Sequence, residues 1–210
     1  MGYNIKMWIF IKKGKEPCIG EVIESLLKIG AIIDKRNAPS FFASSHPFAG
    51  SLNEMRELIS KRGGSIPFSY SGIDFDLVYF FPEHALQPLS IVGIQCDRAN
   101  FRKDPQKIAL KFVELSKCVW NALGDEKIFG LADLETGLEA ILDYLKKKGE
   151  LSEGGVSLKS LHEDFINFYN DELVKKLGLK NISASKEIVV RKAKGGVMTF
   201  LKKVPYYLKR

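Results

Sequence analysis

The chain has 210 residues and a net charge of +7, with 45% hydrophobic and 27% charged residues. This composition supports a packed core and excludes an intrinsically disordered chain. No apolar run approaches the roughly 18 residues that a membrane-spanning helix needs, and the first one, Met7 to Ile11, is too short for a signal peptide. We therefore expect one cytoplasmic domain over residues 1–210 without a membrane partner, with 150–155 as the best position for an internal boundary.

The first quarter of the chain shows a strand followed by two helices. Residues 3–12 alternate in hydrophobicity, which predicts a strand, and residues 18–30 have the spacing of an amphipathic helix. Prolines, serines and phenylalanines between 37 and 50 are typical of a loop. Ser51 and Glu54 then form a capping-box pattern that predicts the start of a second helix.

The middle of the chain predicts two strands and a long helix. Residues 73–81 alternate over a full strand length, and residues 89–96 predict a second strand antiparallel to it. Asp104 is a favourable helix N-cap, and Pro105 suits the first helical position. We therefore expect a helix to begin there and to extend to about residue 123, where its apolar stripe ends.

The last third predicts a strand at 128–132, a helix at 134–148, and further helix at 158–177 with an interruption near Asn170. Two β-rich runs within 187–203 flank Gly195-Gly196, which indicates a hairpin because both glycines can adopt the positive φ angles of a tight turn. Taken together, these elements predict an α+β fold: a mainly antiparallel sheet with helices packed on one face.

Metal and cofactor motifs are missing from the sequence. The three cysteines have no C-x-x-C spacing, and the three histidines have no metal-ligand spacing to one another or to a cysteine. Glycine-rich phosphate-binding loops and the nucleophile-elbow motif are also missing. We therefore expect no cofactor.

Positive charge is concentrated at the end of the chain. Residues 180–210 hold nine Lys and Arg against one acid, a net charge of +8, so the remaining residues carry −1. Such a segment can bind nucleic acid, or its lysines can protect edge strands from aggregation. We favour the second interpretation and expect only weak, non-specific nucleic-acid binding. The low glutamine content, three residues, is typical of thermophiles.

Polar residues gather after the strand at 89–96 and after the next one. If the intervening helix connects parallel strands, both sets emerge at the same sheet edge. Carboxylates at Asp97, Asp133 and Glu135 could then hold a divalent cation. The alternative is a local salt-bridge network near Asp97, with Asp133 as the cap of the following helix. The basic members of this polar cluster are Arg98, Arg102 and Lys103.

One resemblance is to nucleases of the restriction-endonuclease-like superfamily. Their core carries an acid on one strand and, one hairpin later, an acid or Gln followed two residues on by Lys. The segments Gly72-Ile73-Asp74 and Ile94-Gln95-Cys96-Asp97 are similar to that layout. The resemblance implies catalytic roles for Asp74, Gln95 and Asp97, although Asp97 stands where the family has its water-activating lysine. Lys103 or Lys107 would have to replace that lysine.

The second half of the chain resembles small α+β immunity-type proteins, which neutralise toxins by binding them. The resemblance covers about residues 90–206. It implies a binding protein without an active site, so we interpret the chain as a non-enzymatic protein that acts on an unidentified protein partner, with the nuclease-like reading as the alternative. The segments that carry the resemblance are Phe101-Arg102, Phe129-Gly130, Asn167-Phe168-Tyr169, Leu173 to Gly178, Gly195 to Met198 and Val204-Pro205.

Overall fold

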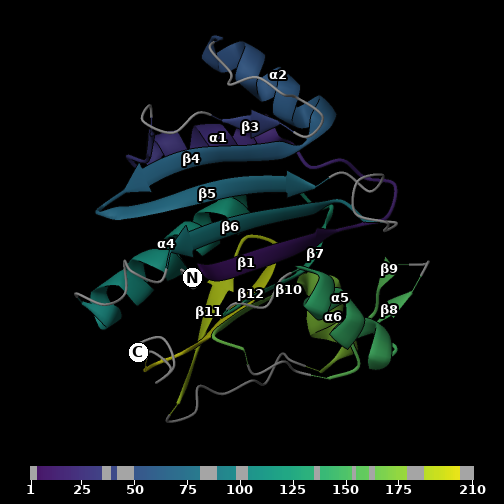
Figure 1. Cartoon of the computed structure of the whole chain (residues 1–210). Helices are drawn as coiled ribbons and strands as arrows, with labels where there is room; N and C mark the ends of the chain where they lie inside the picture. The colour runs from purple at the N-terminus through teal and green to yellow at the C-terminus, as the bar shows by residue number, and fades with distance from the viewer. Residues whose placement is uncertain are drawn as a thin grey trace.

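A ten-stranded antiparallel sheet dominates the protein (Figure 1). The computed structural model describes residues 4–34, 39–41, 50–80, 89–97, 104–134, 138–152, 155–160, 164–178 and 187–203. Along the sheet the strands are β11 (Ile188–Ala193), β12 (Gly196–Leu201), β10 (Ile166–Asn170), β7 (Lys127–Leu134), β1 (Asn4–Ile11), β6 (Ile91–Asp97), β5 (Ile73–Phe80), β4 (Gly64–Tyr70) and β2 (Ile32–Ile33), with β3 (Ser40–Phe41) also paired to β4. The predicted α+β class and antiparallel sheet are confirmed.

Helices pack against the sheet and close two apolar layers. The helices are α1 (Ile19–Lys28), α2 (Leu52–Arg62), α4 (Pro105–Ala122), α5 (Leu138–Lys147) and α6 (Asp171–Lys176). A separate two-stranded sheet pairs β8 (Leu151–Ser152) with β9 (Gly155–Val156). In Figure 1, α1 and α4 lie behind the sheet and α5 and α6 lie in front of it. No helix among the described residues is long and apolar enough to cross a membrane.

The larger core lies between the sheet and the helices α1, α2 and α4. The odd-numbered residues of β1 and β5 form the sheet side of this core. They point to one face because successive strand residues alternate between the two faces. Phe112, Val119 and Trp120 of α4 fill its centre, and Trp120 stacks on Phe168 of β10 with ring centroids 5.0 Å apart. We call this side of the sheet the first face.

The smaller core lies on the second face and covers only part of it. Trp8 and Phe10 of β1 and Phe129 of β7 pack there with Leu142 of α5 and Leu173 of α6. These two helices therefore close the half of the second face that lies over β1, β7 and β10.

The predicted helix starts are confirmed. The Ser51 hydroxyl accepts a hydrogen bond from the Glu54 amide at 3.3 Å, and the Glu54 carboxylate accepts one from the Ser51 amide at 2.6 Å. The Asp104 carboxylate accepts from the Lys107 amide at 3.2 Å, with Pro105 at the first helical position. These signals are readable because each joins residues three apart.

One expectation was wrong in the sheet, and one strand was not predicted. Residues 158–177 do not form a helix throughout: Ile166–Asn170 form β10, and among the described residues of this range only Asp171–Lys176 are helical. All five β10 residues are buried, and a strand buried on both faces has no alternating pattern to distinguish it from a helix. The strand β4 was missed because Pro67, which cannot donate to a ladder, lies in its middle.

The predicted C-terminal hairpin is confirmed, with different roles for its two glycines. β11 pairs with β12, and β12 pairs with β10, so the hairpin forms one end of the described sheet. Gly195 has φ +67° in the turn, as expected. Gly196 begins β12, and any side chain there would collide with the backbone of Tyr169 and Asn170. Gly196 is therefore required by close packing of strands rather than by the turn.

Candidate functional site

A row of polar residues crosses four neighbouring strands on the second face. Asp76 of β5 lies opposite Gln95 of β6, Gln95 lies opposite Lys6 of β1, and Lys6 lies opposite Asp133 of β7. Directly opposed residues in an antiparallel sheet have Cβ atoms about 5 Å apart. Asp74 lies two residues from Asp76 on the same face of β5. We call Lys6, Asp74, Asp76 and Gln95 the polar row.

The polar row lies on the half of the second face that α5 and α6 leave open. Those helices pack over Trp8 and Phe10, and no helix in the described ranges lies over the β4–β6 half (Figure 1). Asp74 is exposed, and the side chains of Lys6, Asp76 and Gln95 are half-buried. The row is therefore accessible to a partner.

Asp76 is the half-buried acid of the row. Burial raises the pKa of its carboxyl above the ordinary value, and a hydrogen bond from the Ser65 side chain lowers it in part. A partly desolvated carboxylate gains from an external cation or donor more than an exposed one does, because its water shell is already incomplete. Perturbed groups of this kind are frequent at functional sites.

The structure places the nuclease-like residues on neighbouring strands. Asp74 lies opposite Ser69 of β4, and Asp97 lies opposite Asn4 of β1. Asp133 lies within β7, so it is not the cap of α5, which begins at Leu138. The strands β6 and β7 run in the same direction, but they are not neighbours because β1 lies between them.

Several predicted site residues fall outside what the structure describes. These are Arg98, Arg102, Lys103 and Glu135, together with the side chains of Asp97 and Asp133. Lys107 is described, and its amide lies in the first turn of α4 on the Asp104 cap. The lysine that the fold does bring to Gln95 is Lys6, which sequence reasoning missed because it precedes Gln95 by 89 positions.

Metal-binding chemistry has no ready ligand set in the described part of the chain. No three His, Cys, Asp or Glu side chains there gather closely enough to hold an ion. Asp74 and Asp76 supply two carboxylates of the polar row.

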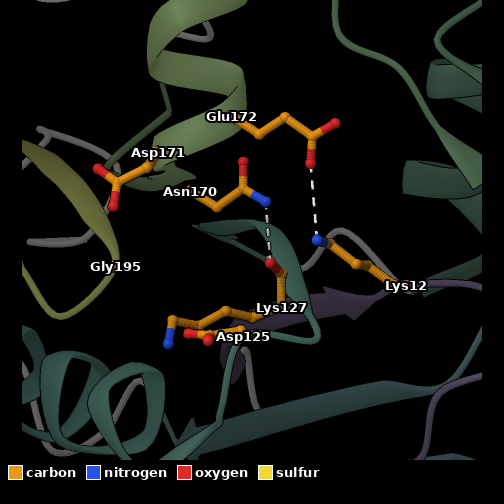
Figure 2. A pocket seen from close by; sticks show the side chains of 7 residues that line it. All are labelled: Lys12, Asp125, Lys127, Asn170, Asp171, Glu172 and Gly195. Atoms are coloured by element: carbon orange, nitrogen blue, oxygen red, sulfur yellow. Dashed lines mark hydrogen bonds and ion pairs between the residues drawn. The ribbon is translucent and has the colours of Figure 1, made fainter.

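A second polar site, which no sequence motif predicted, lies at the opposite end of β1 from Lys6. A pocket of about 280 Å³ is formed where the end of β1, the start of β7, the β10–α6 junction and the hairpin turn meet (Figure 2). Figure 2 shows the Lys12 amine directed at the Glu172 carboxylate, which it meets at 3.6 Å. The lining residues are Lys12, Asp125, Lys127, Asn170, Asp171, Glu172 and Gly195.

Lys127 is the central residue of this junction and is only 1% exposed. Its amine donates to the backbone carbonyls of Leu123 at 2.6 Å and Gly124 at 2.8 Å, at the end of α4, and lies 5.3 Å from the centre of the Trp120 ring. Burial lowers the pKa of this amine, and repulsion from Lys194 lowers it further. The contacts satisfy two carbonyls that directly follow the last residue of α4, Ala122.

Asn170 completes the junction from the other side. Its side-chain amide donates to the Lys127 carbonyl at 3.1 Å, and its side-chain oxygen accepts from the Leu173 amide at 2.9 Å, so it caps α6 (Figure 2). The Lys127 amine and the Asn170 side-chain amide, at the floor of the pocket, therefore donate to backbone carbonyls of the protein itself. This arrangement joins α4, β7 and α6 and is best explained as structural.

Comparison with known proteins gives a fold neighbour and no family. No family model matches the chain, and no curated protein matches it in sequence. Among solved structures, the fold is similar to that of the T6SS (type VI secretion system) protein PA0821 of Pseudomonas aeruginosa. The TM-score is 0.53 at 12% sequence identity, over 94% of this chain and 68% of that one. At this identity the similarity shows a shared fold.

Proposed function

We propose that this protein is a non-enzymatic binding protein of the immunity type, and that the open half of the second face binds a basic surface of its protein partner. The observation that carries the proposal is the polar row, which lies on a sheet face that no described helix covers. Sheets normally bury an apolar face, so an uncovered face with charged residues is suited to a polar interface.

The net charge of the polar row determines which kind of partner surface it can bind. Asp74 and Asp76 outnumber Lys6, and the register places Asp97 further along β6 and Asp133 on the neighbouring β7. Complementary potentials favour a partner that presents Lys or Arg to this surface. Asp76 contributes further because a bound cation would relieve the burial of its charge.

The fold neighbour supports the same interpretation. PA0821 is described as a T6SS protein, and the fold it shares with this chain extends over nearly the whole of the latter. Secretion-system proteins act through contacts with other proteins. The sequence resemblance to immunity-type proteins, over about residues 90–206, points in the same direction.

The test is capture of a partner and loss of that capture on charge reversal. We expect the immobilised chain to retain a basic protein from the organism that produces it, and the double variant Asp74→Lys, Asp76→Lys to lose it. The matched control reverses Glu139 and Asp143, which are exposed on α5. Co-expression with the chain should also suppress the toxicity or activity of the captured protein. Equal retention by all three chains, or unaltered activity, would contradict the proposal.

The alternative is a metal-dependent nuclease or an inactive relative, and one observation favours it. Lys6 lies opposite Gln95 and could stand in for the lysine that is missing two residues after Gln95. A plasmid-cleavage assay with magnesium or manganese separates the two functions. We expect no cleavage; cleavage that is lost in both Asp74→Ala and Lys6→Ala would establish the nuclease instead.

A further inference from the structure

A groove lies between α1 and α4 on the outer side of the first face, away from the polar row. Its volume is about 440 Å³, within the range of sites that bind drug-sized ligands. Its lining residues are Ser25, Lys28 and Ile29 of the α1 end and Glu114, Lys117, Cys118, Asn121 and Ala122 of α4. The α4 residues recur at intervals of three and four, so they form one stripe of that helix.

The floor of the groove is apolar. Ile29, at the end of α1, is 38% exposed. Ala122 and the half-buried Cys118 lie across from it, and burial raises the pKa of the Cys118 thiol. A neutral thiol behaves as a small apolar group, so the floor suits an aliphatic or aromatic side chain.

The rim of the groove is positive. Lys28 and Lys117 have no hydrogen-bond or ion-pair partner in the described part of the chain. Glu114, the acid on the rim, already accepts from Lys111 at 2.8 Å. The two amines are therefore available to an external acid beside the apolar floor.

The turn of the C-terminal hairpin packs beside the groove. The amide of Lys194 donates to the Asn121 side chain at 2.9 Å, and the Trp120 indole donates to the Lys194 carbonyl at 3.1 Å. These bonds hold the hairpin turn against α4, beside the groove. The basic segment recognised in the sequence thus lies next to an apolar recess, with Arg191 and Lys192 on the adjoining strand.

We propose that this groove binds an acidic segment of a second protein, which places one apolar side chain between Lys28 and Lys117 with carboxylates on both sides of it. Charge complementarity determines the occupant, because an apolar floor ringed by unpaired amines matches an apolar residue flanked by Asp or Glu. Nucleic acid is a poorer match, since no aromatic residue lines the groove for base stacking. The proposal is independent of the first, because the groove lies on the opposite face.

Selection from a displayed library of random peptides tests the groove without assuming a sequence. We expect enrichment of peptides in which Leu, Ile or Phe is flanked by acids. The best peptide should bind the full chain in a fluorescence anisotropy titration at about 150 mM salt, and Lys28→Glu, Lys117→Glu should weaken it by about tenfold or more. The control Lys146→Glu, Lys147→Glu on α5 should change the affinity less than twofold, within about 0.4 kcal/mol. Circular dichroism melts verify that all variants fold.

Alkylation of Cys118 locates the bound peptide. In a Cys18→Ser background, which removes the exposed thiol, saturating peptide should slow modification of Cys118 severalfold. The proposal is overturned if enriched peptides lack acids, if the charge-reversed variant binds them equally, or if Cys118 is not protected. It is also overturned if a DNA oligonucleotide binds at sub-micromolar affinity and displaces the peptide, because the groove would then be part of a nucleic-acid surface.

Discussion

Trp8 and Lys6 lie two residues apart on the same face of β1, yet their surroundings differ completely. Trp8 is 2% exposed beneath the cover of α5 and α6 and packs on Phe80 with ring centroids 5.8 Å apart. Lys6 is half-buried and lies between Gln95 and Asp133 in the polar row. The strand itself does not decide which half is core and which is surface. The position of the helices decides it, and the residues along β1 match that boundary.

Replacement of Trp8 by Ala should have the largest effect on stability. A buried tryptophan truncated to alanine costs about 3–5 kcal/mol through lost burial and the cavity that remains. The Trp8 ring also lies on Gly93, where any side chain would collide with it, so the surroundings are shaped to this ring. Urea denaturation followed by circular dichroism measures the change.

Lys6→Ala is the matched control on the same strand and face. We expect a change within about 0.5 kcal/mol, which is usual for surface positions. Similar losses in the two variants would show that the polar half of the face is as tightly packed as the covered half, and would count against its role as an interface.

Lys127→Met should have the next largest effect. Methionine retains the aliphatic packing on Trp120 but removes the donor to the Leu123 and Gly124 carbonyls. Buried carbonyls without a partner cost about 1–3 kcal/mol, so we expect a loss of that order in denaturant titration. Lys12→Met, at the exposed pair with Glu172, should cost less than about 0.5 kcal/mol. An unchanged free energy of unfolding in Lys127→Met would mean that water replaces the amine.

Stability at alkaline pH should show the effect of the lowered pKa of Lys127. Burial holds the pKa of Lys127 below its ordinary value of 10.5, so between the two values the unfolded chain binds more protons than the folded one. Stability contributed by this residue therefore rises with pH across that window and is constant below it. The difference in unfolding free energy between the native chain and Lys127→Met should grow as pH approaches 10.5. A constant difference would show that the amine titrates normally.

Asp76→Asn should have the smallest effect, and it should be stabilising. Burial raises the pKa of Asp76 above 3.8, so folding favours the protonated form, and that preference is lost as pH rises through the folded-state pKa. Asparagine removes the charge, and we expect a gain of up to about 0.5 kcal/mol at neutral pH. The gain should vanish in acid. A loss at neutral pH would indicate that Asp76 already has a stabilising cation partner in the fold.

The site shows how far sequence reasoning extends. Asp74, Gln95 and Asp97 were singled out from one local pattern, and the register places them on the adjacent strands β5 and β6. Lys6 could not be assigned to the same row, because its place depends on β1 entering between β6 and β7. Lys127 gave no signal at all, since a lysine at the start of a strand ordinarily faces water.

The sequence by itself determined the local structure. The caps at Ser51 and Asp104, the strand at β5 and the hairpin turn at Gly195 follow from interactions among residues a few positions apart, which persist in almost any fold. Tertiary structure alone decided the rest. β10 is a strand because β7 and β12 flank it, and Gly196 is needed because of the nearby Tyr169 backbone. Strand order, and with it the polar row and the α1–α4 groove, depends on packing between segments far apart in the chain, which no local pattern encodes.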